Sequence, residues 1–210
     1  MESFHDLSKI KISARNQEWE QKFLDAFVAS EVLVTSEDVQ VGPDGWPYLY
    51  LNTDLESGSG MRDKALNVVQ WAYQHGVGLV INPQKEKPDY VFNFGMLWSY
   101  AHRSVFVSLF DDVYDENAQV YIAKVTDDII PNHAQNILKE YIRSAGVENP
   151  RAALITRNKV NYELAFGIES LNNPPNHEHQ GIAKGLSWFM PTDMPIVLLY
   201  EKKFQELYPF

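Results

Sequence analysis

Two histidines close together are the side chains best placed to bind a metal in this chain, which has no cysteine. His177 and His179 flank Glu178, and two imidazoles with one carboxylate are ligands that suit a transition metal. A zinc site needs three or four ligands, however, and no second cluster of histidine or aspartate lies nearby in the sequence. We therefore expect a polar loop here, with no metal and no cofactor.

A third histidine, His102, stands next to Arg103 after an aromatic run. It could act as a general base, or it could be a hydrogen-bonded structural residue, which is the more common role of a lone histidine. An alternative function therefore stays open: a hydrolase-type enzyme that uses His102 or the loop of His177 and His179, with or without a metal.

The remaining acid and nucleophile patterns argue against catalysis. Adjacent residues of a strand point to opposite faces, so neighbouring carboxylates do not form an acid–base dyad by themselves. The neighbouring pairs are Asp111–Asp112, Asp115–Glu116 and Asp127–Asp128. The chain also lacks the G-x-S-x-G nucleophile motif and a Walker A loop. These patterns favour a non-enzymatic protein.

Composition excludes further classes of protein. The 210 residues carry 18 Lys+Arg against 28 Asp+Glu, a formal charge of −10. An acidic surface repels phosphate and no run of basic residues is present, which excludes the usual kind of nucleic-acid binder. The absence of cysteine excludes a disulfide scaffold and thiolate catalysis. The length allows one large or two small domains that fold without a disulfide or a bound metal.

The sequence gives no sign of a membrane protein. The segment Met1–Lys11 lacks the apolar core of a secretory signal. The longest apolar windows, Val105–Phe110 and Ile196–Tyr200, are far shorter than the roughly 20 residues that cross a bilayer. We expect a soluble cytoplasmic protein that does not bind membranes.

Apolar periodicity predicts mixed helices and strands in the first half. Asn16–Ala29 has the stripe of a helix, and Met61–His75 reads as a second helix that is apolar on nearly all sides and so covered on more than one. Short β-branched or alternating runs predict strands at Glu31–Thr35, Tyr48–Leu51, Gly78–Asn82, Asp89–Phe94 and Ser104–Phe110.

The second half has a clearer pattern. Pro131–Ala145 is an amphipathic helix, and Gly181–Phe189 is a short one. Strands are expected at Val120–Val125, Ala152–Thr156, Val160–Ile168 and Ile196–Tyr200. The order β-α-β-β-α-β predicts a ferredoxin-like unit. With a boundary in the acidic stretch Asp111–Asn117, we expect an α+β fold of two domains, residues 1–115 and 116–210. The loop Asn172–Gln180 should be exposed and mobile.

Several sequence segments resemble the enhanced serine sensitivity protein B (SseB-like) family, which pairs an N-terminal and a C-terminal domain. They are FLDAFVASEVLV at Phe23–Val34, WPYLYLNT at Trp46–Thr53, GVGLVINP at Gly76–Pro83, NPRAALIT at Asn149–Thr156 and YELAFGI at Tyr162–Ile168. The resemblance implies the same two-domain organisation. It implies no catalytic residues.

Aromatic residues are the one compositional excess, at 13%. Alternation predicts that Tyr48 and Tyr50 share an outward strand face beside Trp46. Phe92, Phe94, Met96, Trp98 and Tyr100 keep a spacing of two. We therefore expect a binding or regulatory protein that recognises a protein or peptide partner through aromatic residues. The expected binding residues are Trp46, Tyr48, Tyr50, Trp98 and Tyr100, and the aromatic ladder could instead join a homodimer.

Overall fold

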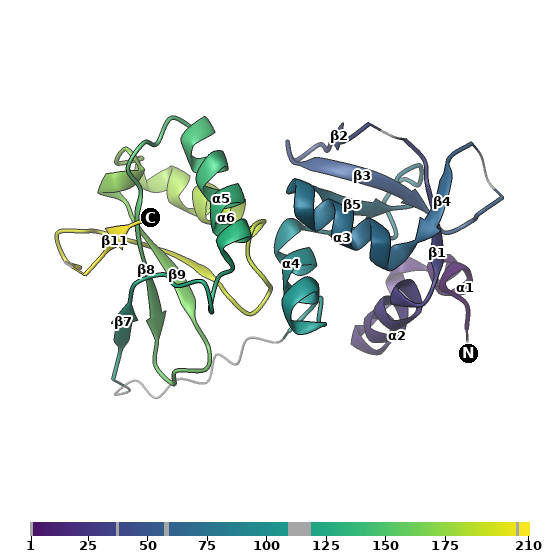
Figure 1. Cartoon of the computed structure of the whole chain (residues 1–210), viewed down its shortest axis with the longest axis horizontal. Coiled ribbons are helices and arrows are strands. Elements are labelled where there is room, and N and C mark those ends of the chain that lie inside the picture. Colours follow the sequence, from purple (N-terminus) through teal and green to yellow (C-terminus); the bar gives the residue numbers. More distant parts are fainter. Residues whose placement is uncertain (1, 37, 57–58, 109–118, 205) are drawn as a thin grey trace. The chain divides into compact units, whose positions relative to one another are not determined.

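The computed structural model describes residues 2–36, 38–56, 59–108, 119–204 and 206–210. The chain has an α+β fold and divides into two compact units, Met1–Phe106 and Val107–Phe210 (Figure 1). The predicted domain boundary between residues 115 and 116 lies outside the described residues.

The first unit is built on a mixed sheet with the strand order β4-β1-β3-β5-β6, and β2 pairs with β3 beside β1. Its strands are β1 (Glu31–Val34), β2 (Gln40–Val41), β3 (Pro47–Asn52), β4 (Met61–Lys64), β5 (Gly78–Ile81) and β6 (Tyr90–Phe92). Its helices are α1 (Phe4–Lys9), the 3₁₀ turn η1 (Ile12–Ala14), α2 (Gln17–Val28), α3 (Ala65–His75) and α4 (Phe94–Arg103).

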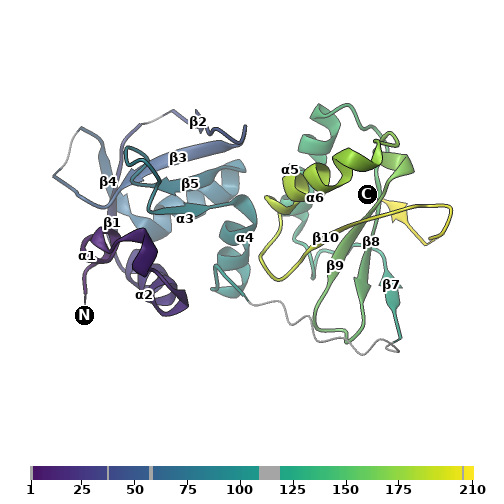
Figure 2. The same ribbon diagram turned by 180° about the vertical axis from the view of Figure 1, so that it is seen from behind.

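Strand β3 shows why the two faces of this sheet differ. Tyr48 and Tyr50 alternate with Leu49 and Leu51, and β3 pairs in parallel with β5 so that Leu49 lies beside Leu79. Figures 1 and 2, taken from opposite sides, show α3 lying along one side of the sheet. Leu49 lies on the side of α3, and the two tyrosines point to the other side.

Helix α2 joins this unit through aromatic contacts, as its apolar stripe predicts. Asn16 caps the helix by accepting from the backbone N–H of Trp19. The ring of Phe27 stacks on Phe92 of β6 with a centroid distance of 4.8 Å. The Tyr90 hydroxyl donates to Glu20, and burial together with this carboxylate raises the pKa of Tyr90 above its usual range. Helix and strand are therefore joined by both packing and a partly buried hydrogen bond.

Two predicted elements of the first unit differ from the structure, and the structure decides a third stretch that the sequence left open. Residues 61–64 form strand β4, paired with β1, and the helix begins only at Ala65. The aromatic run after Phe92 forms helix α4, because Asn93 accepts from the backbone N–H of Met96 as an N-cap. In the expected strand Ser104–Phe110, residues 104–108 are not in a strand and the last two lie outside the described residues.

The second unit holds a five-stranded sheet with the order β10-β9-β8-β11, and β7 pairs with β8. Its strands are β7 (Tyr121–Ala123), β8 (Arg151–Thr156), β9 (Glu163–Gly167), β10 (Ile196–Leu199) and β11 (Tyr208–Pro209). Its helices are α5 (Asn132–Ser144), α6 (His179–Ser187) and the 3₁₀ turns η2 (Glu169–Leu171) and η3 (Asn176–Glu178).

The ferredoxin-like detail is not confirmed. The predicted element order β-α-β-β-α-β is present from β7 to β10. A split βαβ arrangement separates the two parallel strands by another strand. Here the parallel strands β9 and β10 are direct neighbours, and β7 pairs with β8 instead of lying between them. The order of elements along the chain does not encode this pairing.

The loop Asn172–Gln180 is more constrained than the sequence predicts. Most of its residues are exposed, as expected. The amide of Asn172 nevertheless donates to the carbonyl of Gly146, and the ring of His179 donates to the carbonyl of Pro174. The Tyr200 hydroxyl donates to Asn176. These bonds argue against a mobile loop, and its last residues belong to η3 and the start of α6.

Among the residues that the structure describes, no helix combines the length and the apolar character needed to cross a membrane.

Candidate functional site

The expected aromatic surface is partly assembled at β3. Tyr48 and Tyr50 line a shallow groove of about 270 Å³ with Val80 and Val91. Tyr48 is only 3% exposed, however, and its hydroxyl donates to Asp44 at 2.7 Å. It forms the floor of the groove and cannot anchor a partner, which corrects the expectation for Tyr48. Tyr50 is half-buried, and Val91 is an exposed apolar residue of the groove.

The other expected binding residues do not join this groove. Trp98 and Tyr100 belong to α4, so their spacing of two does not place them on one face. Trp98 is 2% exposed and belongs to the core, and Tyr100 stacks on Phe106 with a centroid distance of 4.2 Å. Trp46 is half-buried and is not among the lining residues. The five expected residues therefore do not form one patch.

The described contacts of His102 do not resemble those of a catalytic base. Its Nε2 lies 2.8 Å from the hydroxyl of Tyr73, and the two rings meet edge to face. This contact joins α4 to α3. A general base of a hydrolase is oriented by an acidic or carbonyl partner, and the described contacts of His102 include none.

The loop of His177 and His179 does not assemble a metal site among the described residues. Groups of three or more histidine, aspartate or glutamate side chains that could hold a metal are absent from that part of the chain. His177 is exposed, 3.7 Å from the Glu178 carboxylate, whereas His179 is half-buried against Tyr200. The two imidazoles thus have separate local partners.

A buried charged cluster surrounds Asp89 where β3 and β5 end. The carboxylate of Asp89 accepts from Arg15 at 2.6 Å and from Asn82 at 2.5 Å, and it also pairs with Lys85. Asn82 continues the network by donating to Thr53. Arg15 comes from the segment before α2, so the cluster fastens this N-terminal segment to the sheet.

The environment of Asp89 favours its ionised form. Burial by itself would raise the pKa of this carboxyl, but hydrogen bonds from Arg15, Lys85 and Asn82 outweigh burial and lower the pKa below its ordinary value. Because the described contacts satisfy the carboxylate within the protein, the cluster has the character of a structural ion network. Sequence reasoning missed it, since Arg15 and Asp89 are far apart in the chain.

An apolar pocket with exposed methionine and tryptophan side chains lies beside α3 in the first unit, and we name it the Met61–Trp71 pocket. It has a volume of about 340 Å³. Its lining residues are Val34, Leu49, Met61, Asp63, Asn67, Val68 and Trp71. Met61 is 57% exposed and Trp71 is 38% exposed. Tryptophan and methionine are enriched in binding surfaces, so this pocket is the strongest candidate site of the unit.

Neighbouring contacts fix the orientation of the groups in this pocket. The indole of Trp71 stacks on His75 with a centroid distance of 4.2 Å, and the His75 ring donates to the Trp71 carbonyl. Met61 and Asp63 alternate along β4 and so share a face of the sheet. The Asp63 carboxylate accepts from Asn67 at 2.7 Å. The pocket therefore presents an ordered indole beside a carboxylate.

The sequence contains one signal for this pocket. Trp71 lies outside the main apolar stripe of its helix, which suggests a second covered side. In the structure Tyr73 is covered by α4, but Trp71 and Leu66 stay exposed. The sequence does not place Met61 in this pocket, because its pattern assigns residue 61 to the start of a helix. Only a strand at residues 61–64 places Met61 beside Trp71.

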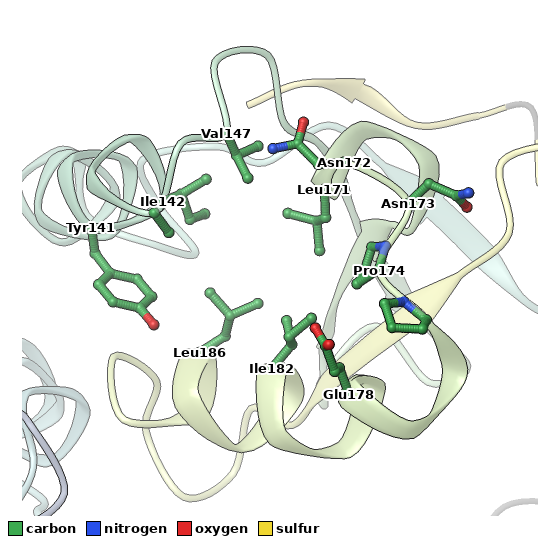
Figure 3. Close-up of a pocket in the computed structure, with 12 residues that line it drawn as sticks. Tyr141, Ile142, Val147, Leu171, Asn172, Asn173, Pro174, Glu178, Ile182 and Leu186 are labelled. Atoms are coloured by element: carbon green, nitrogen blue, oxygen red, sulfur yellow. The ribbon is translucent and has the colours of Figure 1, made fainter.

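The second unit has a cavity of its own, of about 400 Å³, between the end of α5 and the start of α6 (Figure 3). Aliphatic side chains make up much of its wall, including Ile142, Ile182 and Leu186. The polar members of the lining are Tyr141, Asn172, Asn173 and Glu178. None of the residues expected to bind lies in it.

Comparisons of the chain with family models, with curated proteins and with solved structures find no match. The resemblance to the SseB-like family therefore stays a prediction.

Proposed function

We propose that this protein is a non-enzymatic binding or regulatory protein that recognises a protein partner through the Met61–Trp71 pocket. The observation that carries the proposal is the exposure of Trp71 and Met61 around an apolar pocket in the isolated chain. Covering such groups with a partner removes apolar surface from water, which is the dominant favourable contribution to most protein association. The proposed place of action is the cytoplasm, as expected from the sequence.

The partner that suits this pocket has an apolar side chain beside a basic residue. A volume of about 340 Å³ lies at the small end of ligand sites. That volume suits one large side chain better than a whole folded element. Asp63 places a carboxylate in the wall, and the chain carries a formal charge of −10. Lysine or arginine next to the inserted side chain would therefore gain favourable electrostatic energy.

Selection from a phage-displayed library of random dodecapeptides on the immobilised full-length chain tests the proposal. We expect enrichment of peptides in which a large apolar residue stands next to lysine or arginine. Phage that bind the parent should not bind Trp71→Ala, and Asp63→Asn should select fewer basic residues.

Tyr50→Ala is the matched control, because Tyr50 is an aromatic residue on the opposite face of the same sheet. It should retain the selected phage. Loss of binding in Tyr50→Ala but not in Trp71→Ala would move the site to the groove at β3. Failure to enrich any sequence would contradict the proposal.

A further inference from the structure

The cavity of the second unit combines an aliphatic wall with a carboxylate. Its aliphatic members come from the end of α5, from the residues that follow it, from η2 and from α6. They are Ile142, Val147, Leu171, Ile182 and Leu186. Glu178 lies at the start of α6, and Figure 3 shows its carboxylate directed toward the cavity. Tyr141 approaches from α5 on the opposite side.

The loop that closes this cavity has a defined shape. Asn172 and Asn173 both adopt positive φ angles, 67° and 50°, which asparagine tolerates better than most residues. The backbone N–H of Asn173 donates to the carbonyl of Ile168, and the Asn172 amide donates to that of Gly146. Two prolines follow and restrict the backbone further. The wall is therefore formed before any ligand arrives.

Two features give the cavity a negative character. Glu178 supplies a carboxylate at the open edge of the cavity, on a side chain that is 55% exposed. Tyr141, Ile142 and Ala145 belong to the last turn of α5 and its C-cap, where the helix dipole places partial negative charge. Burial raises the pKa of Tyr141. Its neutral phenol can accept or donate a hydrogen bond.

We propose that the cavity between α5 and α6 binds a small organic ammonium ion with an apolar body. The aliphatic wall contacts the body, and the ammonium group pairs with the Glu178 carboxylate at the mouth. The cavity volume lies within the range of small-molecule sites. This site is separate from the proposed protein-binding pocket.

Three probes of matched shape test the ligand class: phenethylammonium, 2-phenylethanol and 3-phenylpropionate. We expect phenethylammonium to shift the NMR signals of the Ile142, Ile182 and Leu186 methyl groups of the full-length chain. Its affinity should exceed that of the alcohol about fivefold, the effect of a partly exposed ion pair. The carboxylate probe should bind most weakly.

Variants separate the roles of charge and shape. Glu178→Gln should remove the preference for the ammonium probe over the alcohol while both still bind. Glu140→Gln, which changes an exposed carboxylate of α5 outside the cavity, should preserve the preference. Ile182→Trp should fill the cavity and abolish binding of all three probes.

Glu178 also has a structural role to set apart, because a carboxylate at the start of α6 is favourable to the helix dipole. If Glu178 served only the helix, Glu178→Gln should lower the free energy of unfolding, and the ammonium should still be the probe that binds best. Equal binding of the ammonium and the alcohol to the parent would overturn the proposed ligand class. The absence of methyl shifts with every probe would overturn the site, and so would binding that Ile182→Trp leaves intact.

Discussion

The ring of Tyr48 occupies the space that a side chain at Gly78 would need. The two residues are paired across the parallel strands β3 and β5. A Cβ atom at Gly78 would lie 2.6 Å from the ring of Tyr48 and 2.7 Å from the carbonyl oxygen of Phe92. This pairing explains why Tyr48 is buried on a face that alternation alone assigns to the outside.

Gly78→Ala should therefore destabilise the first unit. Because backbone and a buried ring both limit relaxation, we expect a loss of about 1–3 kcal/mol in the free energy of unfolding, measured by urea denaturation. Gly181→Ala is the matched control, since its Cβ would meet nothing within 4 Å in α6. The control should be neutral or stabilising by up to about 1 kcal/mol. Equal behaviour of the two variants would contradict the packing of Tyr48.

Asp89→Asn should be costly at neutral pH. Asparagine leaves the buried guanidinium of Arg15 without its charge partner, and such losses are about 3–5 kcal/mol. Asp25→Asn, at an exposed carboxylate of α2, is the control and should change the free energy of unfolding by less than about 0.5 kcal/mol. A small loss in Asp89→Asn would mean that the cluster does not fasten the N-terminal segment.

The same carboxylate should make stability depend on pH. The pKa of Asp89 is lowered in the folded protein, so the ionised form contributes stability that is fully present above the unfolded pKa of about 3.9. That contribution is lost as the pH falls through the folded pKa. Chemical denaturation between pH 6 and pH 2 should therefore show a steeper loss in the parent than in Asp89→Asn. Parallel curves would contradict the lowered pKa.

Leu138→Ala tests the apolar face of α5 that the sequence predicts, at a side chain that the structure buries completely. The expected loss is about 2–5 kcal/mol in the free energy of unfolding of the second unit. Arg143→Ala, at an exposed position of the same helix, should cost less than about 0.5 kcal/mol. A loss that small in Leu138→Ala would show that this helix face is not core.

Local patterns predicted much of the fold. Helices α2 and α5 lie close to their predicted bounds. The spacing of apolar residues along the chain indicates which helix face is buried, and so predicts both helices. The spacing of aromatic residues after Phe92 was misleading, since the Asn93 cap and packing of α4 decide a helix there. Strand pairing in the second unit depends on contacts between distant residues, and the order of elements leaves it open.

The candidate site was less predictable than the fold. Alternation correctly places Tyr48 and Tyr50 on one face, but exposure depends on what covers that face. Gly78 lets the Tyr48 ring sink into the sheet, which alternation cannot reveal. The Met61–Trp71 pocket needs β4, a strand held by pairing with β1 and not by its own charged sequence. The site is therefore a product of tertiary pairing.

Met61→Ala should separate binding from stability. The Met61 side chain is more than half exposed, so its truncation should change the free energy of unfolding by less than about 0.5 kcal/mol. Its loss should nevertheless weaken a peptide selected on the parent, because methionine contributes contact area at the pocket wall. Calorimetry and denaturation of the same preparation check both statements. A variant that is destabilised without losing affinity would assign Met61 to the core.

The most direct test of the account is the dissociation constant of a selected peptide for Trp71→Ala, measured beside the parent and Tyr50→Ala by isothermal titration calorimetry. If Trp71 anchors the partner, its truncation should raise the dissociation constant about thirtyfold, the effect of a hot-spot residue of about 2 kcal/mol. Tyr50→Ala should stay within about twofold of the parent. An unchanged dissociation constant for Trp71→Ala would contradict the central claim.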